Sequence, residues 1–153
     1  MKKLDSIDQK MISALLNGGP MSAKALASSL GMHPNTALQR LKKLENGKVL
    51  NGYKPNVDFE KLGFGIHIAI MMKVKRGRPG DISQFKEILQ MKELESFYAI
   101  SGPWDIVSTW RVQDKDHLNR VLSKITGHQN ITKTMSQLIL YTYKDVSGFN
   151  PLG

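Results

Sequence analysis

The chain has 153 residues, 41% of them hydrophobic and 23% charged, which indicates a globular protein of one ordinary domain or two small ones. It contains no cysteine, which excludes disulfides and thiolate metal sites, and no apolar run approaches the roughly 20 residues that span a bilayer. The 22 Lys and Arg against 13 Asp and Glu give a formal net charge of +9, which favours polyanionic partners. We therefore expect a cytoplasmic protein with no membrane partner.

Three short helices are predicted in the first 50 residues. Apolar residues recur at helical spacing over residues 4–16, with Asp5 as the N-cap. Ser22 caps a second helix that ends at Gly31, and a third helix begins at Pro34 and ends at Asn46-Gly47. Two short helices joined by so tight a turn are typical of a helix-turn-helix, whose second helix enters the major groove of DNA.

The outer side of the third predicted helix carries polar and basic residues, opposite a buried side at Ala37, Leu38, Leu41 and Leu44. Asn35 and Gln39 are suited to adenine, and Arg40 to guanine or a phosphate. Lysines supply affinity for phosphates without sequence information. The candidate DNA-binding residues are Ser22, His33, Asn35, Thr36, Gln39, Arg40, Lys42, Lys43 and Lys48.

Two alternatives remain open on this helix. Its polar side is also what any solvated helix presents, although the capped helix and the glycine turn before it favour DNA binding. His33 occupies the N-cap position, where Ser, Thr, Asp or Asn is usual, so it either leaves a poorly capped end or contacts a phosphate.

The rest of the chain predicts a small β-wing followed by an α+β domain. The wing covers residues 49–57 and leads into a linker that ends near residue 63. Then follow a strand at 66–75, a turn at 77–80, a helix over 82–89, strands at 94–101 and 105–112, a helix capped by Asp114, and a strand at 134–143. This βαββαβ order is ferredoxin-like. The expected fold is thus α+β, with a winged helix-turn-helix over 1–50, a wing and linker over 51–63, and a ferredoxin-like effector-binding and oligomerisation domain over 64–153.

In the ferredoxin-like arrangement, both helices lie on one face of a four-stranded antiparallel sheet and the other face stays open. With Met71 and Trp110 on the strands, we expect the open face to be an apolar patch. Self-association, at least into a dimer, is the physical expectation.

Several stretches, in this order and spacing, resemble one family. They are residues 4–12, 26–27, 31–34, 40–47, 49–53, 57–58, 61–64 and 101–105. The sequence is similar to the Lrp/AsnC family of prokaryotic transcriptional regulators over nearly its whole length. The resemblance implies a winged helix-turn-helix joined to a ferredoxin-like effector domain, dimers that often assemble into octamers, and an amino acid or related metabolite bound between dimers.

The resemblance also implies an effector site. Residues 102–105 correspond to the family's Gly-x-Tyr-Asp element, in which the acid receives the effector's amino group, although Trp104 replaces the usual tyrosine. The implied ligands are Ser101, Gly102, Trp104 and Asp105, with Thr134 and Ser136 as second candidates. Ordinary turn chemistry is an equal explanation for Asp105.

Other functions are less well supported. A few relatives of the family are decarboxylases of the haem pathway, but the four histidines here, His33, His67, His117 and His128, lie in separate elements without metal-ligand spacing. His67 is the one catalytic candidate, and no metal, cofactor or enzymatic activity is expected. An architectural protein that coats DNA would use the same DNA-facing residues. RNA stacking on Phe97 and Tyr98 is disfavoured because the basic-aromatic signature of such a strand is missing.

Overall fold

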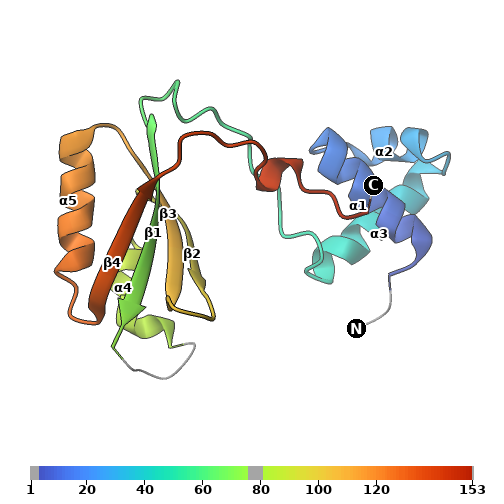
Figure 1. Cartoon of the computed structure of the whole chain (residues 1–153). Helices are drawn as coiled ribbons and strands as arrows, with labels where there is room; N and C mark the ends of the chain where they lie inside the picture. The colour runs from blue at the N-terminus through green and yellow to red at the C-terminus, as the bar shows by residue number, and fades with distance from the viewer. Residues whose placement is uncertain (1–3, 76–80, 153) are drawn as a thin grey trace. The chain divides into compact units, whose positions relative to one another are not determined.

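The computed structural model describes residues 4–75 and 81–152, so the turn predicted at 77–80 lies outside the described residues. The chain divides into two units. The first contains Met1–Asn56 together with Tyr143–Gly153, and the second contains Val57–Thr142. Figure 1 traces the elements of both units in chain order.

The first unit contains the three predicted helices, α1 (Ser6–Gly18), α2 (Ala23–Ser29) and α3 (Pro34–Asn46). Asp5 caps α1 by accepting a hydrogen bond from the Asp8 N–H at 2.8 Å, and Ser22 caps α2 by accepting one from the Ala25 N–H at 3.1 Å. Gly31, at φ 64°, makes the tight turn after α2. The helix-turn-helix predicted from spacing and caps is therefore confirmed.

Two details of this unit differ from the prediction. Residues 50–58 contain no regular secondary structure, so the expected wing hairpin is not formed. Leu38 is 41% exposed rather than buried. In the turn after α3, which ends the helix at Asn46-Gly47 as predicted, Lys48 has a positive φ of 56°. The Lys48 and Val49 N–H groups donate to the Glu45 and Leu44 carbonyls.

The second unit is a four-stranded antiparallel sheet with two helical segments on one face (Figure 1). Its elements are β1 (Ile66–Val74), η1 (Ile82–Phe85), α4 (Lys86–Leu89), β2 (Leu94–Ala99), β3 (Ile106–Val112), α5 (Lys115–Thr126) and β4 (Ile131–Leu138). The strand order β2-β3-β1-β4 is the ferredoxin-like one. The last strand begins and ends earlier than predicted, at residues 131 and 138 rather than 134 and 143.

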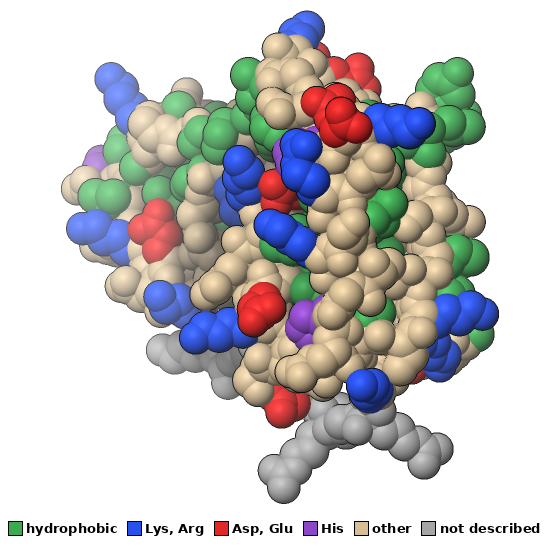
Figure 2. All heavy atoms as spheres, turned by 90° about the vertical axis from the view of Figure 1, so that its left-hand side faces the viewer, with side chains coloured by type: hydrophobic (Ala, Val, Ile, Leu, Met, Phe, Trp, Pro, Cys, Tyr) green, Lys and Arg blue, Asp and Glu red, His purple; other side chains and the backbone are tan. Residues whose placement is uncertain are grey.

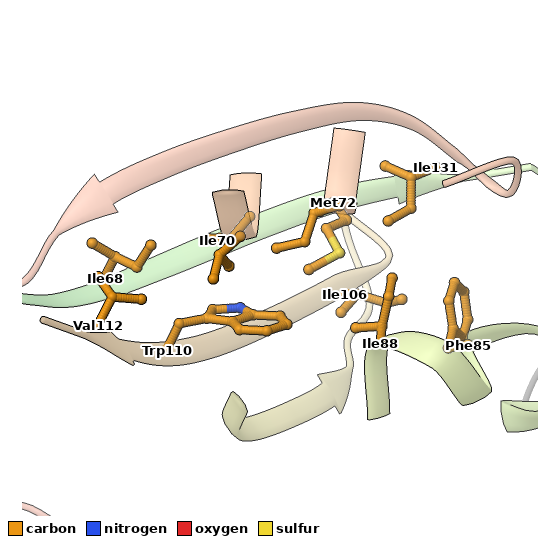
Figure 3. Packing of buried hydrophobic residues seen from close by; sticks show 11 residues of the cluster. Ile68, Ile70, Met72, Phe85, Ile88, Ile106, Trp110, Val112 and Ile131 are labelled. Carbon is orange, nitrogen blue, oxygen red and sulfur yellow. The ribbon is translucent and has the colours of Figure 1, made fainter. Parts of the chain in front are cut away.

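The core of the second unit lies between the sheet and its helices. Alternate residues of β1 and β3 point into it, and Trp110 lies in the same buried cluster as Ile70 of β1 and Ile88 of α4 (Figure 3). The Trp110 indole N–H donates to the Ser108 hydroxyl at 2.8 Å, and that hydroxyl donates to the Ile70 carbonyl at 3.0 Å. The expectation that Trp110 belongs to the open face is thus wrong, because β3 turns its even-numbered side chains toward the helices.

The C-terminal segment, residues 143–153, completes the first unit by packing against α1. It contains the short 3-10 helix η2 (Val146–Gly148), and beyond it the Asn150 side-chain amide donates to the Ser13 hydroxyl at 3.0 Å and to the Asn17 amide oxygen at 2.8 Å. Both partners lie on α1. Within residues 4–75 and 81–152, every helix is too short or too polar to cross a membrane.

Candidate DNA-reading surface and effector site

The outer face of α3 presents four polar side chains to solvent. Asn35, Thr36, Gln39 and Lys42 are all exposed, whereas Ala37 is fully buried. Positions 35, 39 and 42 recur at three and four residues, so they lie along one side of the helix. Two amides and a hydroxyl on one side are suited to base edges, and the lysine is suited to a phosphate.

Ser22, His33 and Lys48 lie at the ends of the helix-turn-helix helices and are exposed. The His33 imidazole caps α3, because its Nδ1 accepts a hydrogen bond from the Asn35 N–H at 3.3 Å. The N-terminus of α3 is therefore capped by a histidine side chain, and the alternative of a poorly capped helix end is wrong. The Nδ1 atom, being an acceptor here, leaves the opposite ring nitrogen as the one that can approach a phosphate.

Arg40 and Lys43 do not extend away from α3 as the sequence suggested. The Arg40 guanidinium donates to both Asp5 and Asp8, each at 2.7 Å, and the Lys43 ammonium donates to the second oxygen of Asp8, also at 2.7 Å. The two cations turn toward α1 because the Asp8 carboxylate has no exposed surface and is stable there only with positive charge beside it. The pairing of the two cations with these acids departs from their expected role as DNA contacts.

These ion pairs set the acidity of the two carboxyls. Burial acts to raise the pKa of Asp8, but hydrogen bonds from Lys43 and Arg40 outweigh burial and lower it below the usual value. The hydrogen bond from Arg40 is the main reason that the pKa of Asp5 is lowered. Both acids are therefore held in the charged form, and α1 is tied to α3 through them.

The candidate effector loop lies where β1 ends and β3 begins. Gly102 has a φ of 110°, which a residue with a side chain adopts only with strain. The Asp105 carboxylate accepts a hydrogen bond from the Val74 N–H at 2.9 Å and pairs with the Lys73 ammonium at 3.2 Å. These contacts lower the pKa of Asp105, first through Val74 and then through Lys73. The Asp105 side chain is 36% exposed and thus within reach of solvent and solutes.

A second lysine completes the surroundings of this loop. The Lys133 ammonium lies 5.6 Å from the centre of the Trp104 ring, a cation-π contact between β4 and the loop. Lys73 and Lys133 are paired in the register of β1 with β4, so they lie side by side. Sequence reasoning missed both lysines, since the pairing of strands distant in the chain has no local signal.

The two second candidates for the effector site, Thr134 and Ser136, do not lie beside the loop 101–105. Thr134 and Ser136 pair with Met72 and Ile70, whose side chains lie in the helix-covered core. Strand alternation therefore directs them to that face of the sheet, whereas Lys73 and Lys133 lie on the opposite face. Ser136 lines a groove of about 350 Å³ beside α5 instead. Ser101, by contrast, is exposed on the loop itself.

Two histidines of the second unit lie in hydrogen-bonded pairs with glutamates. His67 Nε2 lies 2.8 Å from Glu95, which also accepts from Arg111 at 2.9 Å, and His117 Nε2 lies 2.9 Å from Glu93. No group of three or more metal-ligating side chains occurs among residues 4–75 and 81–152. On the side of the molecule that carries α5, basic and acidic side chains are interspersed rather than gathered into one basic patch (Figure 2).

A helix-turn-helix with a polar outer face, followed by a ferredoxin-like domain with a polar loop, defines a DNA-binding regulator with a separate ligand-binding domain. The family model of the AsnC-type helix-turn-helix domain matches residues 4–45, and that of the Lrp/AsnC ligand binding domain matches residues 68–149. The chain therefore belongs to the Lrp/AsnC family of transcriptional regulators. Proteins of this family are regulators rather than enzymes, so the alternative of a decarboxylase is wrong.

Individual relatives agree with this assignment. The chain is 26% identical over 144 residues to the HTH-type transcriptional regulator FL11 of Pyrococcus horikoshii, covering 94% of each chain. It is 29% identical over 122 residues to the leucine-responsive regulatory protein of Haemophilus influenzae, covering 79% of this chain and 74% of that one.

Solved structures share the fold. A transcriptional regulator of Neisseria meningitidis in complex with L-Met superposes with a TM-score of 0.88 at 20% identity, covering 97% of each chain. E. coli AsnC gives a TM-score of 0.81 at 20% identity, covering 95% of this chain and 99% of that one.

Proposed function

We propose that this protein is a sequence-specific regulator in which the outer face of α3 reads base edges in the major groove. The observation that carries the proposal is the exposure of Asn35, Thr36 and Gln39 on one side of a helix that follows α2 across a tight turn. An amide side chain can make a bidentate contact to adenine, and such a contact discriminates between bases. Lys42 lies on the same side and supplies a phosphate contact.

Three further groups border this face and are proposed to hold the phosphate backbone. Ser22 lies at the N-terminus of α2, where unpaired N–H groups favour an anion. His33 and Lys48 lie at the two ends of α3. Contacts of this kind fix the position of a protein on the duplex without reading its sequence.

The effector is proposed to be an amino acid or a related small metabolite, bound at the loop 101–105. The match to a ligand-binding family model and the L-Met complex of the Neisseria protein support this class of ligand. An incoming ammonium would take the place that the Lys73 ammonium holds beside Asp105, and the backbone around Ser101 and Gly102 would receive the carboxylate. Trp104 would form an apolar wall of the site.

Assembly into dimers through the open face of the sheet is proposed as the working form, with octamers as a further stage. Tyr98 on that face is 61% exposed in the single chain, and the strand register places Met71, Val107 and Met135 on the same face. Exposed apolar side chains of this size favour association. A dimer would place two copies of α3 in successive major grooves of a near-palindromic site. A regulator of this kind works beside the chromosome, so we place it in the cytoplasm.

The test is a comparison of affinities for a selected operator and for random DNA, with and without an amino-acid mixture. A specific regulator is expected to prefer its operator by about a thousandfold or more. A protein that binds both DNAs alike would instead be an architectural, DNA-coating protein. The effector half of the proposal predicts that Asp105→Asn removes the response to amino acids while operator binding in their absence stays unchanged.

A further inference from the structure

The N-terminus of α1 is joined to the middle of α3 by a small ionic cluster, which we call the carboxylate clamp. It consists of Asp5 and Asp8 on one side and Arg40 and Lys43 on the other, joined by three contacts of 2.7 Å each. Asp8 is fully buried, and both of its oxygens accept from these cations. Two positive charges of the reading helix are therefore neutralised within the protein itself.

The clamped cations lie beside the reading surface, not away from it. Thr36, Gln39, Arg40 and Lys43 line one surface hollow of about 340 Å³ together with Asp5. The side chains of Arg40 and Lys43 are 24% and 46% exposed. Cations at this place would reach phosphates of a duplex bound to α3 if no acid held them.

Asp5 and Asp8 bind the Arg40 and Lys43 cations more strongly than DNA phosphates would. Charge-assisted hydrogen bonds to a buried carboxylate are stronger than those to an exposed, hydrated anion. Release of the cations would also leave the Asp8 carboxylate buried without a partner, which is strongly unfavourable. A phosphate in solvent offers no comparable compensation.

We propose that Asp5 and Asp8 withhold Arg40 and Lys43 from the DNA backbone and thereby keep sequence-independent affinity low. Each phosphate contact adds affinity for every DNA alike, so two cations removed from this role raise the share of binding that depends on base contacts. The inference rests on the proposed reading of DNA by α3.

The first test compares two neighbouring lysines by the salt dependence of binding to a random-sequence duplex. The slope of log K against log salt changes by about 0.9 for each phosphate contact. Lys42→Gln is expected to flatten the slope by about that amount, whereas Lys43→Gln leaves it unchanged because Lys43 is held by Asp8. An equal flattening in both variants would overturn the proposal.

The second test releases the cations. Asp8→Asn is expected to tighten binding to random and operator DNA alike, and to steepen the slope by about 0.9 to 1.8 for both duplexes. The double variant Asp8→Asn, Lys43→Gln should recover about half of that steepening. Glu45→Gln is the matched control, because it removes an exposed acid from α3 without releasing a cation.

Partial loss of folding in Asp8→Asn is bypassed by Asp5→Asn. Asp5 is half exposed and its ion pair is with Arg40, and an asparagine at this position can still cap α1. This variant should steepen the slope in the same direction by a smaller amount. A slope unchanged from that of the wild type in both Asp variants would contradict the proposal. Failure of the proposed function gives a different pattern: wild type shows no operator preference, while the slope still steepens in Asp8→Asn.

Discussion

The two units of this protein hold their working surfaces by different forces. In the helix-turn-helix unit, the buried apolar residues among those described are Met11, Leu15, Leu26, Ala27, Ala37 and Leu44, and α3 is also tied to α1 by the carboxylate clamp. In the ferredoxin-like unit, eleven buried apolar residues fill the space between sheet and helices (Figure 3).

This difference predicts how each unit responds to its conditions. Apolar burial depends little on pH and is not weakened by salt, so the second unit should be a stable platform for a ligand. Ion pairs depend on protonation, so the position of α3 should respond to acid.

Removal of the largest buried side chain should destabilise only the second unit. Trp110→Ala leaves a cavity against Ile70 and is expected to lower the free energy of unfolding of that unit by about 3 to 5 kcal/mol. Calorimetry should show the shift in one transition. Asn119→Ala, at an exposed position of α5, serves as the control and should change stability by less than about 0.5 kcal/mol. A loss confined to the helix-turn-helix transition would contradict the assignment of Trp110 to this core.

Acid should weaken the first unit through Asp8. Because the pKa of Asp8 is lower in the folded chain than its ordinary value of 3.8, its stabilising effect is complete above that pH and is lost as pH falls through the folded pKa. Asp8→Asn should cost about 2 to 3 kcal/mol at neutral pH and should make the unit less sensitive to acid. Unfolding monitored by helical circular dichroism between neutral pH and pH 2 measures both effects. Equal acid sensitivity in wild type and Asp8→Asn would show that protonation of Asp8 is not what weakens the first unit in acid.

On the reading helix, base contacts and phosphate contacts should separate. Gln39→Ala is expected to weaken operator binding by about 1 to 3 kcal/mol and to relax the base preference at one position. Lys42→Ala should weaken all sequences alike and flatten the salt slope by about one unit. Titration of operator and mismatched duplexes by fluorescence anisotropy distinguishes the two variants. Identical profiles for both would show that Gln39 does not read bases.

The smallest effect concerns the turn after α3. Lys48 adopts a φ of 56°, which costs a residue with a side chain roughly 1 kcal/mol, so Lys48→Gly should stabilise the first unit by up to about 1 kcal/mol. The same change should weaken DNA binding through the lost charge. Lys48→Ala is the matched control, since it loses the charge but keeps the strained φ. A Lys48→Gly protein less stable than Lys48→Ala would contradict this account of the turn.

Much of the fold could be predicted from local signals. Caps at Asp5, Ser22 and Asp114 mark where helices begin, and the period-2 pattern of residues 66–74 marks the central strand β1. The order of elements then selects the ferredoxin-like sheet. The prediction of a wing hairpin was wrong because Asn51-Gly52 forms a hairpin turn only where two strands pair on either side of it. Residues 50–58 form no such pairing.

The candidate sites were less predictable because they depend on pairs distant in the chain. An arginine on a polar helix face suggests a DNA contact, and only the packing of α1 on α3 shows that Arg40 faces two acids. Likewise, the side of the sheet on which Thr134 lies depends on the register of β4 with β1. Lys73 and Lys133 beside the loop 101–105 follow from the same register.

The most direct test of the account is selection of bound sequences from random DNA with the wild-type protein and with Asn35→Ala, Gln39→Ala. The wild type should select one defined, near-palindromic motif, and the double variant should still bind DNA but lose sequence information at symmetric positions within it. Selection of the same motif by both proteins would show that the outer face of α3 is not the surface that reads the operator.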